Sequence, residues 1–190
     1  MRRVLLLLLV ALVLPTTVWA NTISIGNAGG VLTGSTAGLF TSTSSSLVSW
    51  NGTPGSYGTL SFSTGALLSG DLANGGTFAG GGSFVLTANN SSAIFTGTFA
   101  GPVQWQLQSV GGNNFYVLTG TLTGTWSNGQ VVNGATTQLT ISLGSGHFTG
   151  SANLAGGISS FTVVPEPGTL GLMGTGLVSL AGLVRRKLRM

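Results

Sequence analysis

Two side chains in the central part of the chain could take part in acid–base chemistry: Asp71 and His147. Between residues 21 and 164, Asp71 is the only charged residue and His147 is the only histidine. General acid–base catalysis needs titratable groups close together, so a hydrolase would require these two within hydrogen-bonding reach in a cleft. A Ser-His-Asp set can be written with one of the many serines, but no Gly-x-Ser-x-Gly motif in a strand–turn–helix context supports it. We therefore interpret Asp71 as a turn residue and His147 as a residue at the edge of a strand.

Metal, phosphate and nucleic-acid sites have few possible ligands in this sequence. The chain has no cysteine, which removes disulfides, thiolate metal sites and a cysteine nucleophile, and one aspartate makes a poor calcium site. Gly75 to Gly82 is glycine-rich but leads into a strand, so we predict a flexible loop or bulge rather than a phosphate site. Between residues 21 and 164 there is no lysine or arginine, which argues against nucleic-acid binding. We expect no metal, no cofactor and no nucleic-acid partner.

Neutral side chains could still hold a carbohydrate, because aromatic faces and amides bind sugars without any charge. Most large aromatic residues of a small β domain belong to its core, so a sugar site would need two or more of them aligned on an exposed face. The candidate glycan contacts are Trp50, Trp105, Trp126, Tyr57 and Tyr116.

The composition favours a folded β domain over helix or disorder. Hydrophobic residues make up 42% of the 190 residues and charged residues only 4%, whereas disordered chains combine low hydrophobicity with high net charge. The 33 glycines disfavour helix, since each interior glycine costs about 1 kcal/mol relative to alanine. The six basic residues behind the net charge of +4 all lie at the two ends.

Residues 21–164 alternate between apolar and polar positions with a period of two, which is typical of half-buried strands. In the stretch 115–126, Tyr116, Leu118, Leu122 and Trp126 share one face with two glycines, and threonines line the other. We predict an all-β fold, an antiparallel β-sandwich, with a flattened barrel or a β-solenoid as alternatives. The predicted strands are Thr22–Ile25, Leu47–Trp50, Tyr57–Ser63, Ser83–Ala88, Ala93–Phe99, Pro102–Ser109, Phe115–Trp126, Thr137–Leu143, His147–Leu154 and Ile158–Val163.

Turn signals separate several of these strands. Three dipeptides tolerate positive φ in tight turns: Asn51-Gly52, Asn128-Gly129 and Asn133-Gly134. We also predict a hairpin loop from Gly111 to Asn114. Because most neighbouring strands are close in sequence, an antiparallel meander or Greek key is favoured over a parallel sheet.

The first 20 residues have the organisation of a secretory signal peptide. Arg2 and Arg3 form a basic start, and residues 4–14 are an unbroken apolar run too short for a comfortable membrane span. We predict that signal peptidase cuts between Ala20 and Asn21 after export by the secretion machinery. An uncleaved N-terminal anchor is the alternative.

The C-terminal segment, residues 165–190, has three parts in a fixed order. A Pro-Glu-Pro motif, formed by Pro165, Glu166 and Pro167, precedes an uncharged stretch over 168–184. As a helix this stretch would be roughly 24–26 Å long, at the short limit for crossing a bilayer. The basic residues that follow would stay on the cytoplasmic side; they are Arg185, Arg186, Lys187 and Arg189.

This tail closely resembles the PEP-CTERM sorting domain in motif order, spacing and terminal position. The resemblance implies recognition by an exosortase, a membrane-embedded processing enzyme of bacteria that make exopolysaccharide, and release or attachment of the body at the cell surface. The prolines would hold Glu166 in an extended segment that a processing enzyme can grip. The alternative is a plain C-terminal membrane anchor.

Three functions are compatible with these features. The first is a non-enzymatic protein of the cell surface or extracellular matrix, held transiently in the inner membrane by its tail and associated with exopolysaccharide. The second is a carbohydrate-binding module that uses exposed aromatic residues, and the third is a hydrolase built on Asp71 and His147. The sequence favours the first, because catalytic equipment is scarce.

Overall fold

The computed structural model describes residues 21–163, which form thirteen β-strands in one sheet. These residues contain no helix long and apolar enough to cross a membrane. The strands confirm the predicted all-β fold. They are β1 (Asn21–Ala28), β2 (Val31–Ser35), β3 (Gly38–Thr43), β4 (Ser45–Trp50), β5 (Thr53–Ser63), β6 (Leu67–Asp71), β7 (Gly75–Phe78), β8 (Gly81–Ala88), β9 (Ala93–Phe99), β10 (Val103–Val110), β11 (Asn113–Trp126), β12 (Val131–Ser142) and β13 (Ser151–Val163).

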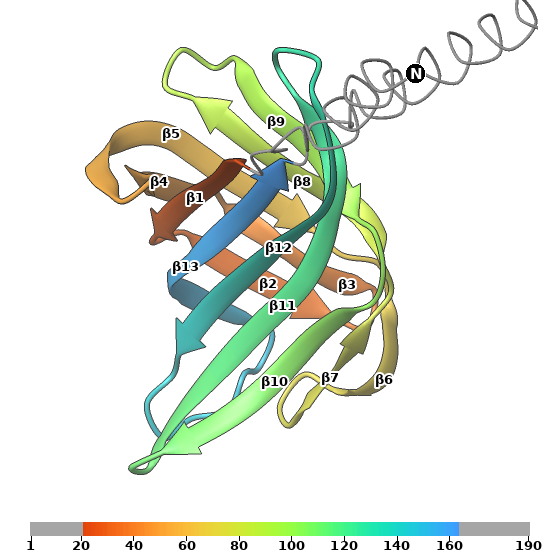
Figure 1. The fold of residues 1–190 in the computed structure, drawn as a ribbon. Coiled ribbons are helices and arrows are strands. Elements are labelled where there is room, and N and C mark those ends of the chain that lie inside the picture. The colour runs from red at the N-terminus through yellow and green to blue at the C-terminus, as the bar shows by residue number, and fades with distance from the viewer. Residues whose placement is uncertain (1–20, 164–190) are drawn as a thin grey trace, which may run out of the picture. The chain divides into compact units, whose positions relative to one another are not determined.

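The thirteen strands belong to a single sheet, which folds over itself into two layers. Pairing runs β11–β12–β13–β1–β4–β5–β8–β9 and returns to β11. In Figure 1 the long strands β11 and β12 cross in front of β2 and β3. Every pairing whose register is defined is antiparallel, which contradicts the parallel coils of the β-solenoid alternative.

Strand β11 has the inward and outward faces that its alternation predicts. Tyr116, Leu118 and Leu122 are at most 1% exposed, while Thr121 and Thr125 are exposed. Gly120 and Gly124 share the inner face with the buried residues because rings of β9 occupy the space beside them. A Cβ atom at Gly120 would lie 2.6 Å from Phe99 Cδ1, and one at Gly124 would lie 2.6 Å from Phe95 Cζ. The two glycines therefore mark the close approach expected of glycine inside a strand.

Aromatic rings fill the space between the layers. Phe84 packs edge-on against Phe95, Phe99 and Phe161, with ring centroids 6.1–6.4 Å apart. Phe95 and Phe161 are closer still, at 4.9 Å. Such pairs contribute about 0.5–1.5 kcal/mol each beyond the burial of their area. The core therefore rests on contacts between the neighbouring strands β8 and β9 and the strand β13, which is far from both in sequence.

The predicted turns at Asn51-Gly52 and Asn128-Gly129 are confirmed, and a third dipeptide behaves differently. Asn51 and Gly52 both have positive φ, 49° and 78°, as a two-residue hairpin turn requires. Asn133-Gly134 was predicted as a turn but lies inside β12, where the register with β11 shifts by one residue. The positive φ of Gly134, 84°, is thus used for a bulge rather than a chain reversal.

Three other sequence predictions are corrected. Residues 75–82, predicted as a loop or bulge, contain β7 and the start of β8. The two strands predicted over 147–154 and 158–163 are one strand, β13, which begins only at Ser151. Strands β2, β3 and β6 were missed. Small residues and glycines hide the alternation in these segments. Pairing with a strand distant in sequence supplies backbone hydrogen bonds to β2, β3 and β7, whereas β6 pairs with the adjacent β7.

Candidate functional site

The single aspartate of the described region closes the turn between β6 and β7. Asp71 Oδ1 accepts hydrogen bonds from the backbone N–H groups of Ala73 (2.8 Å) and Asn74 (2.6 Å). The Asn74 side-chain amide adds contacts of 3.1 and 3.0 Å to the two carboxylate oxygens. Hydrogen bonds from the Asn74 side chain and backbone, then from the Ala73 N–H, lower the pKa of Asp71, with a smaller contribution from nearby His147. The carboxylate is therefore an Asx-turn acceptor, in agreement with its interpretation as a turn residue.

The only histidine of the described region reaches the same turn from the segment before β13. His147 Nδ1 lies 3.0 Å from the Ala73 carbonyl oxygen and 3.3 Å from Tyr116 Oη. Tyr116 Oη donates to the Ala73 carbonyl and accepts from the buried N–H of Phe148 at 3.1 Å. Tyr116 thus ties the β6–β7 turn to the segment that leads into β13.

A tryptophan fixes the other side of this turn. Trp105 Nε1 donates to the Leu72 carbonyl at 2.9 Å, and its ring stacks on Tyr116 with centroids 4.9 Å apart and planes at 20°. Both rings are at most 1% exposed. The polar edges of two buried aromatic side chains therefore satisfy carbonyl groups of the turn, which is the usual requirement for buried Tyr and Trp.

Asp71 and His147 thus approach each other without forming an acid–base pair. Their side chains make no hydrogen bond to one another within residues 21–163, and each bonds to backbone groups of the turn instead. The requirement stated for a hydrolase, hydrogen-bonding reach between them in a cleft, is not met. The arrangement of Asp71, His147 and Tyr116 holds the turn in place.

The five candidate glycan contacts fall into two clusters, and three of them are buried. Trp105 and Tyr116 belong to the turn cluster, and Trp126 is 6% exposed in the core. Trp126 packs against Trp50 with centroids 6.0 Å apart, and Trp50 in turn meets Tyr57 at 6.2 Å. Of the five, Trp50 and Tyr57 are partly exposed, so they are the two neighbouring aromatics that could meet a sugar together.

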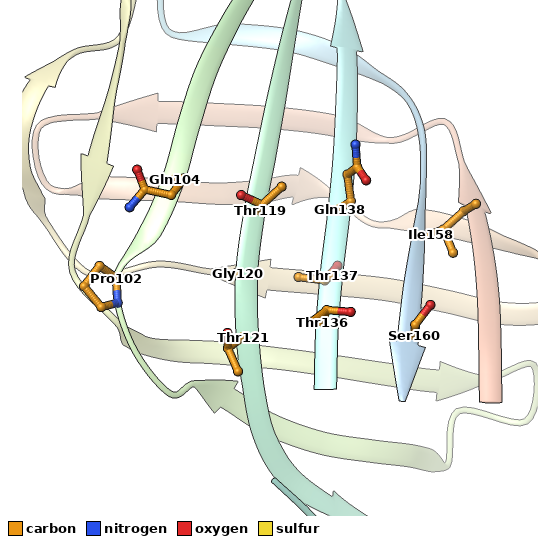
Figure 2. A pocket seen from close by; sticks show the side chains of 10 residues that line it. All are labelled: Pro102, Gln104, Thr119, Gly120, Thr121, Thr136, Thr137, Gln138, Ile158 and Ser160. Atoms are coloured by element: carbon orange, nitrogen blue, oxygen red, sulfur yellow. The ribbon is translucent and has the colours of Figure 1, made fainter. Parts of the chain in front are cut away.

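A concave part of the described surface lies elsewhere, on the outer face of β10–β13. A shallow hollow of about 490 Å³ is lined by neutral residues, and Figure 2 shows most of them in two rows across the strands, with Gly120 and Thr137 between the rows. One row joins Gln104, Thr119, Gln138 and Ile158, each paired directly with the next. The second row joins Thr121, Thr136 and Ser160 in the same way, with Pro102 at its end.

Most polar side chains of the hollow keep their hydrogen-bonding capacity. Gln104 Oε1 accepts from Thr77 Oγ1 at 3.2 Å. The side chains of Thr119, Thr136 and Gln138 make no hydrogen bond within residues 21–163. By contrast Thr137, on the inner face of β12, bonds to the buried Ser159 hydroxyl at 2.8 Å. The outer face is therefore rich in free donors and acceptors, while the Thr137 hydroxyl on the inner face is satisfied by Ser159.

Sequence reasoning placed some residues of the hollow on outward faces but did not predict a site there. The alternation assigned Gln104 and Gln138 to faces opposite the apolar residues, and both lie on the outer face. It did not reveal that β12 lies between β11 and β13. The signal in the sequence that could have indicated the hollow is the alternation of glutamine or threonine with apolar residues, which recurs in β10, β11 and β12.

The predicted processing sites lie outside the described residues. These are Ala20 on the N-terminal side, and on the C-terminal side the motif Pro165, Glu166 and Pro167 with the basic residues Arg185, Arg186, Lys187 and Arg189. The predicted signal peptide over 1–20 and the predicted transmembrane helix over 168–184 are outside as well. Asn21, predicted as the first residue of the mature chain, is the first residue of β1.

One comparison with known proteins gives a match, and it concerns this tail. Residues 163–187 match the family model of the PEP-CTERM protein-sorting motif, which confirms the resemblance drawn from the Pro-Glu-Pro motif, the apolar stretch and the basic end. No curated protein and no solved structure is significantly similar to the chain, and the β body is not assigned to a family.

Proposed function

We propose that this PEP-CTERM domain-containing protein is a non-enzymatic protein of the cell surface or extracellular matrix, sorted by an exosortase and associated with exopolysaccharide. The observation that carries the proposal is the sorting motif over residues 163–187. A motif of this kind is an address that a processing enzyme reads, and it says where the body is delivered. The β body over 21–163 is then the part that acts outside the cell.

The order of segments supports delivery of the body across the membrane. The apolar N-terminal run and its basic start would direct export, and the basic C-terminal end would keep the last residues on the cytoplasmic side. The body would therefore be outside the cytoplasmic membrane when the exosortase meets the Pro-Glu-Pro motif. The tail would hold the protein in the membrane only until processing.

The chemistry of the body supports a role without catalysis. Its two titratable candidates for acid–base work, Asp71 and His147, hydrogen-bond to the backbone of one turn. Its surface carries amides and hydroxyls in place of charge, and such groups can hydrogen-bond to a hydrated polysaccharide. The alternative of a module that binds sugars through exposed aromatics has less support, because Trp105, Trp126 and Tyr116 are buried.

Cell fractionation of a motif variant tests the proposal. Replacing Pro165, Glu166 and Pro167 together by alanine should leave the protein in the membrane fraction, because the extended recognition segment is lost. Thr169→Ala changes the adjacent tail without touching the motif and should reach the surface or the medium as the unaltered protein does. Equal delivery of the triple variant would show that the motif does not direct sorting.

A further inference from the structure

The hollow on the outer face of β10–β13 has the chemistry of a carbohydrate site, and we propose that it binds one chain of a neutral polysaccharide laid across the strands. The inference rests on the proposed function and goes further by naming the class of polymer and the residues that hold it. It does not use the aromatic residues, which are mostly buried.

Free hydrogen-bonding groups are the first argument. The side chains of Thr119, Thr136 and Gln138 have no partner within the described part of the chain, and Thr136 and Gln138 are exposed. Hydroxyl and amide groups both donate and accept, so each can exchange a bond to water for a bond to a sugar hydroxyl. Their placement on strands fixes their positions, because a strand holds its side chains more firmly than a loop does.

Charge decides which polymer fits. An anionic polysaccharide would need lysine or arginine to offset its charge, and there is neither between residues 21 and 164. Asp71, the one charged residue in that span, belongs to the β6–β7 turn and is not among the residues that line the hollow. A chain without ionised groups meets no electrostatic cost at such a surface, whereas burying an unpaired charge is expensive.

The register of the strands gives the direction of the bound chain. The row Gln104, Thr119, Gln138 and Ile158 crosses four strands in direct register, with neighbouring strands about 4.8 Å apart. This spacing is close to the length of one sugar residue in an extended polysaccharide. Successive sugars can therefore meet successive side chains of the row. Ile158, 59% exposed at its end, offers an apolar contact for the non-polar face of a ring.

Affinity measurements on the exported protein, purified from the producing bacterium, test the site. The probes are soluble β-1,4-glucan oligomers, dextran and galactomannan as neutral chains, and alginate as an anionic one. The variants are Thr119→Val with Thr136→Val, which removes two hydroxyls at nearly constant shape, and Gln138→Ala. Thr59→Val with Thr96→Val removes two exposed hydroxyls on β5 and β9 and serves as the matched control.

We expect at least one neutral polysaccharide to bind, at least a tenfold rise in its dissociation constant in both test variants, no change in the control, and no binding of alginate. The site is wrong if no neutral chain binds, if alginate binds as well as the neutral chains do, or if all variants bind equally. It is also wrong if the test variants alter only the sedimentation of the protein, since a second copy of the chain then occupies the hollow. Delivery of each variant to the cell surface is measured in parallel. A variant that reaches the surface but no longer binds leaves the proposed sorting intact. If the unaltered protein does not reach the surface, the proposed function itself is contradicted.

Discussion

Replacing Tyr116 by phenylalanine tests whether the β6–β7 turn is held by the hydroxyl of this buried side chain. The hydroxyl accepts the buried Phe148 N–H at 3.1 Å and donates to the Ala73 carbonyl. In the variant the Ala73 carbonyl keeps His147 Nδ1 at 3.0 Å, but the Phe148 N–H loses its acceptor. A buried donor without a partner costs about 1–3 kcal/mol. We expect the free energy of unfolding to fall by about 2 kcal/mol.

Urea denaturation of the exported protein, followed by tryptophan fluorescence, measures this change. A loss of that size lowers the melting temperature by about 4–8 °C for a domain of this length. Tyr57→Phe is the matched control, because the Tyr57 hydroxyl donates to the Thr53 carbonyl at 3.2 Å in an exposed position and should be worth less than about 0.5 kcal/mol. The reasoning is refuted if Tyr116→Phe is as mild as Tyr57→Phe.

Two further predictions concern the core and the pH dependence of stability. Gly120→Ala should lower the free energy of unfolding by about 1–3 kcal/mol through overpacking, because the new Cβ would lie 2.6 Å from Phe99 Cδ1. Gly101→Ala is the control and should lower it far less, because the space around Gly101 is open. Equal melting temperatures of the two variants would contradict the close packing at Gly120. The pKa of Asp71 is lowered in the folded state, so the stability that its carboxylate adds is present above the unfolded value of about 3.9 and is lost as pH falls through the lower folded value. As pH falls through this acid range, the urea midpoint of the unaltered protein should therefore drop more than that of Asp71→Asn. If the midpoints of the two proteins fall in parallel with pH, the turn does not depend on the ionised carboxylate.

Local signals in the sequence predict the strands and turns that depend on a few neighbouring residues. The alternation around Tyr116 and Leu118 identifies the inner face of β11, and Asn51-Gly52 identifies a hairpin turn, because both are set by side-chain period and backbone φ. The same reasoning fails at Asn133-Gly134. Positive φ is compatible with a bulge as well as with a turn, and only the pairing of β12 with β11 decides between them.

Pairing between distant strands is what the sequence does not reveal. Strands β6 and β7 are short and rich in small residues, so their existence depends on β10, which pairs with β7. The meeting of Asp71 and His147 at Ala73 depends on Tyr116 and on the path of the chain before β13. The hollow likewise requires β10 to β13 to be neighbours. Alternation assigns each residue to a face, but it contains no information on which strands share that face.

The sorting of the chain through its tail is the central claim, and the termini of the exported protein test it most directly. Intact mass and terminal peptide sequencing would compare the protein from the producing bacterium with that from a strain lacking the exosortase. We predict a product that begins at Asn21 in both strains and that loses the tail near Pro165–Pro167 only when the enzyme is present. Persistence of residues 185–190 in both strains would contradict the account and leave the tail as an ordinary membrane anchor.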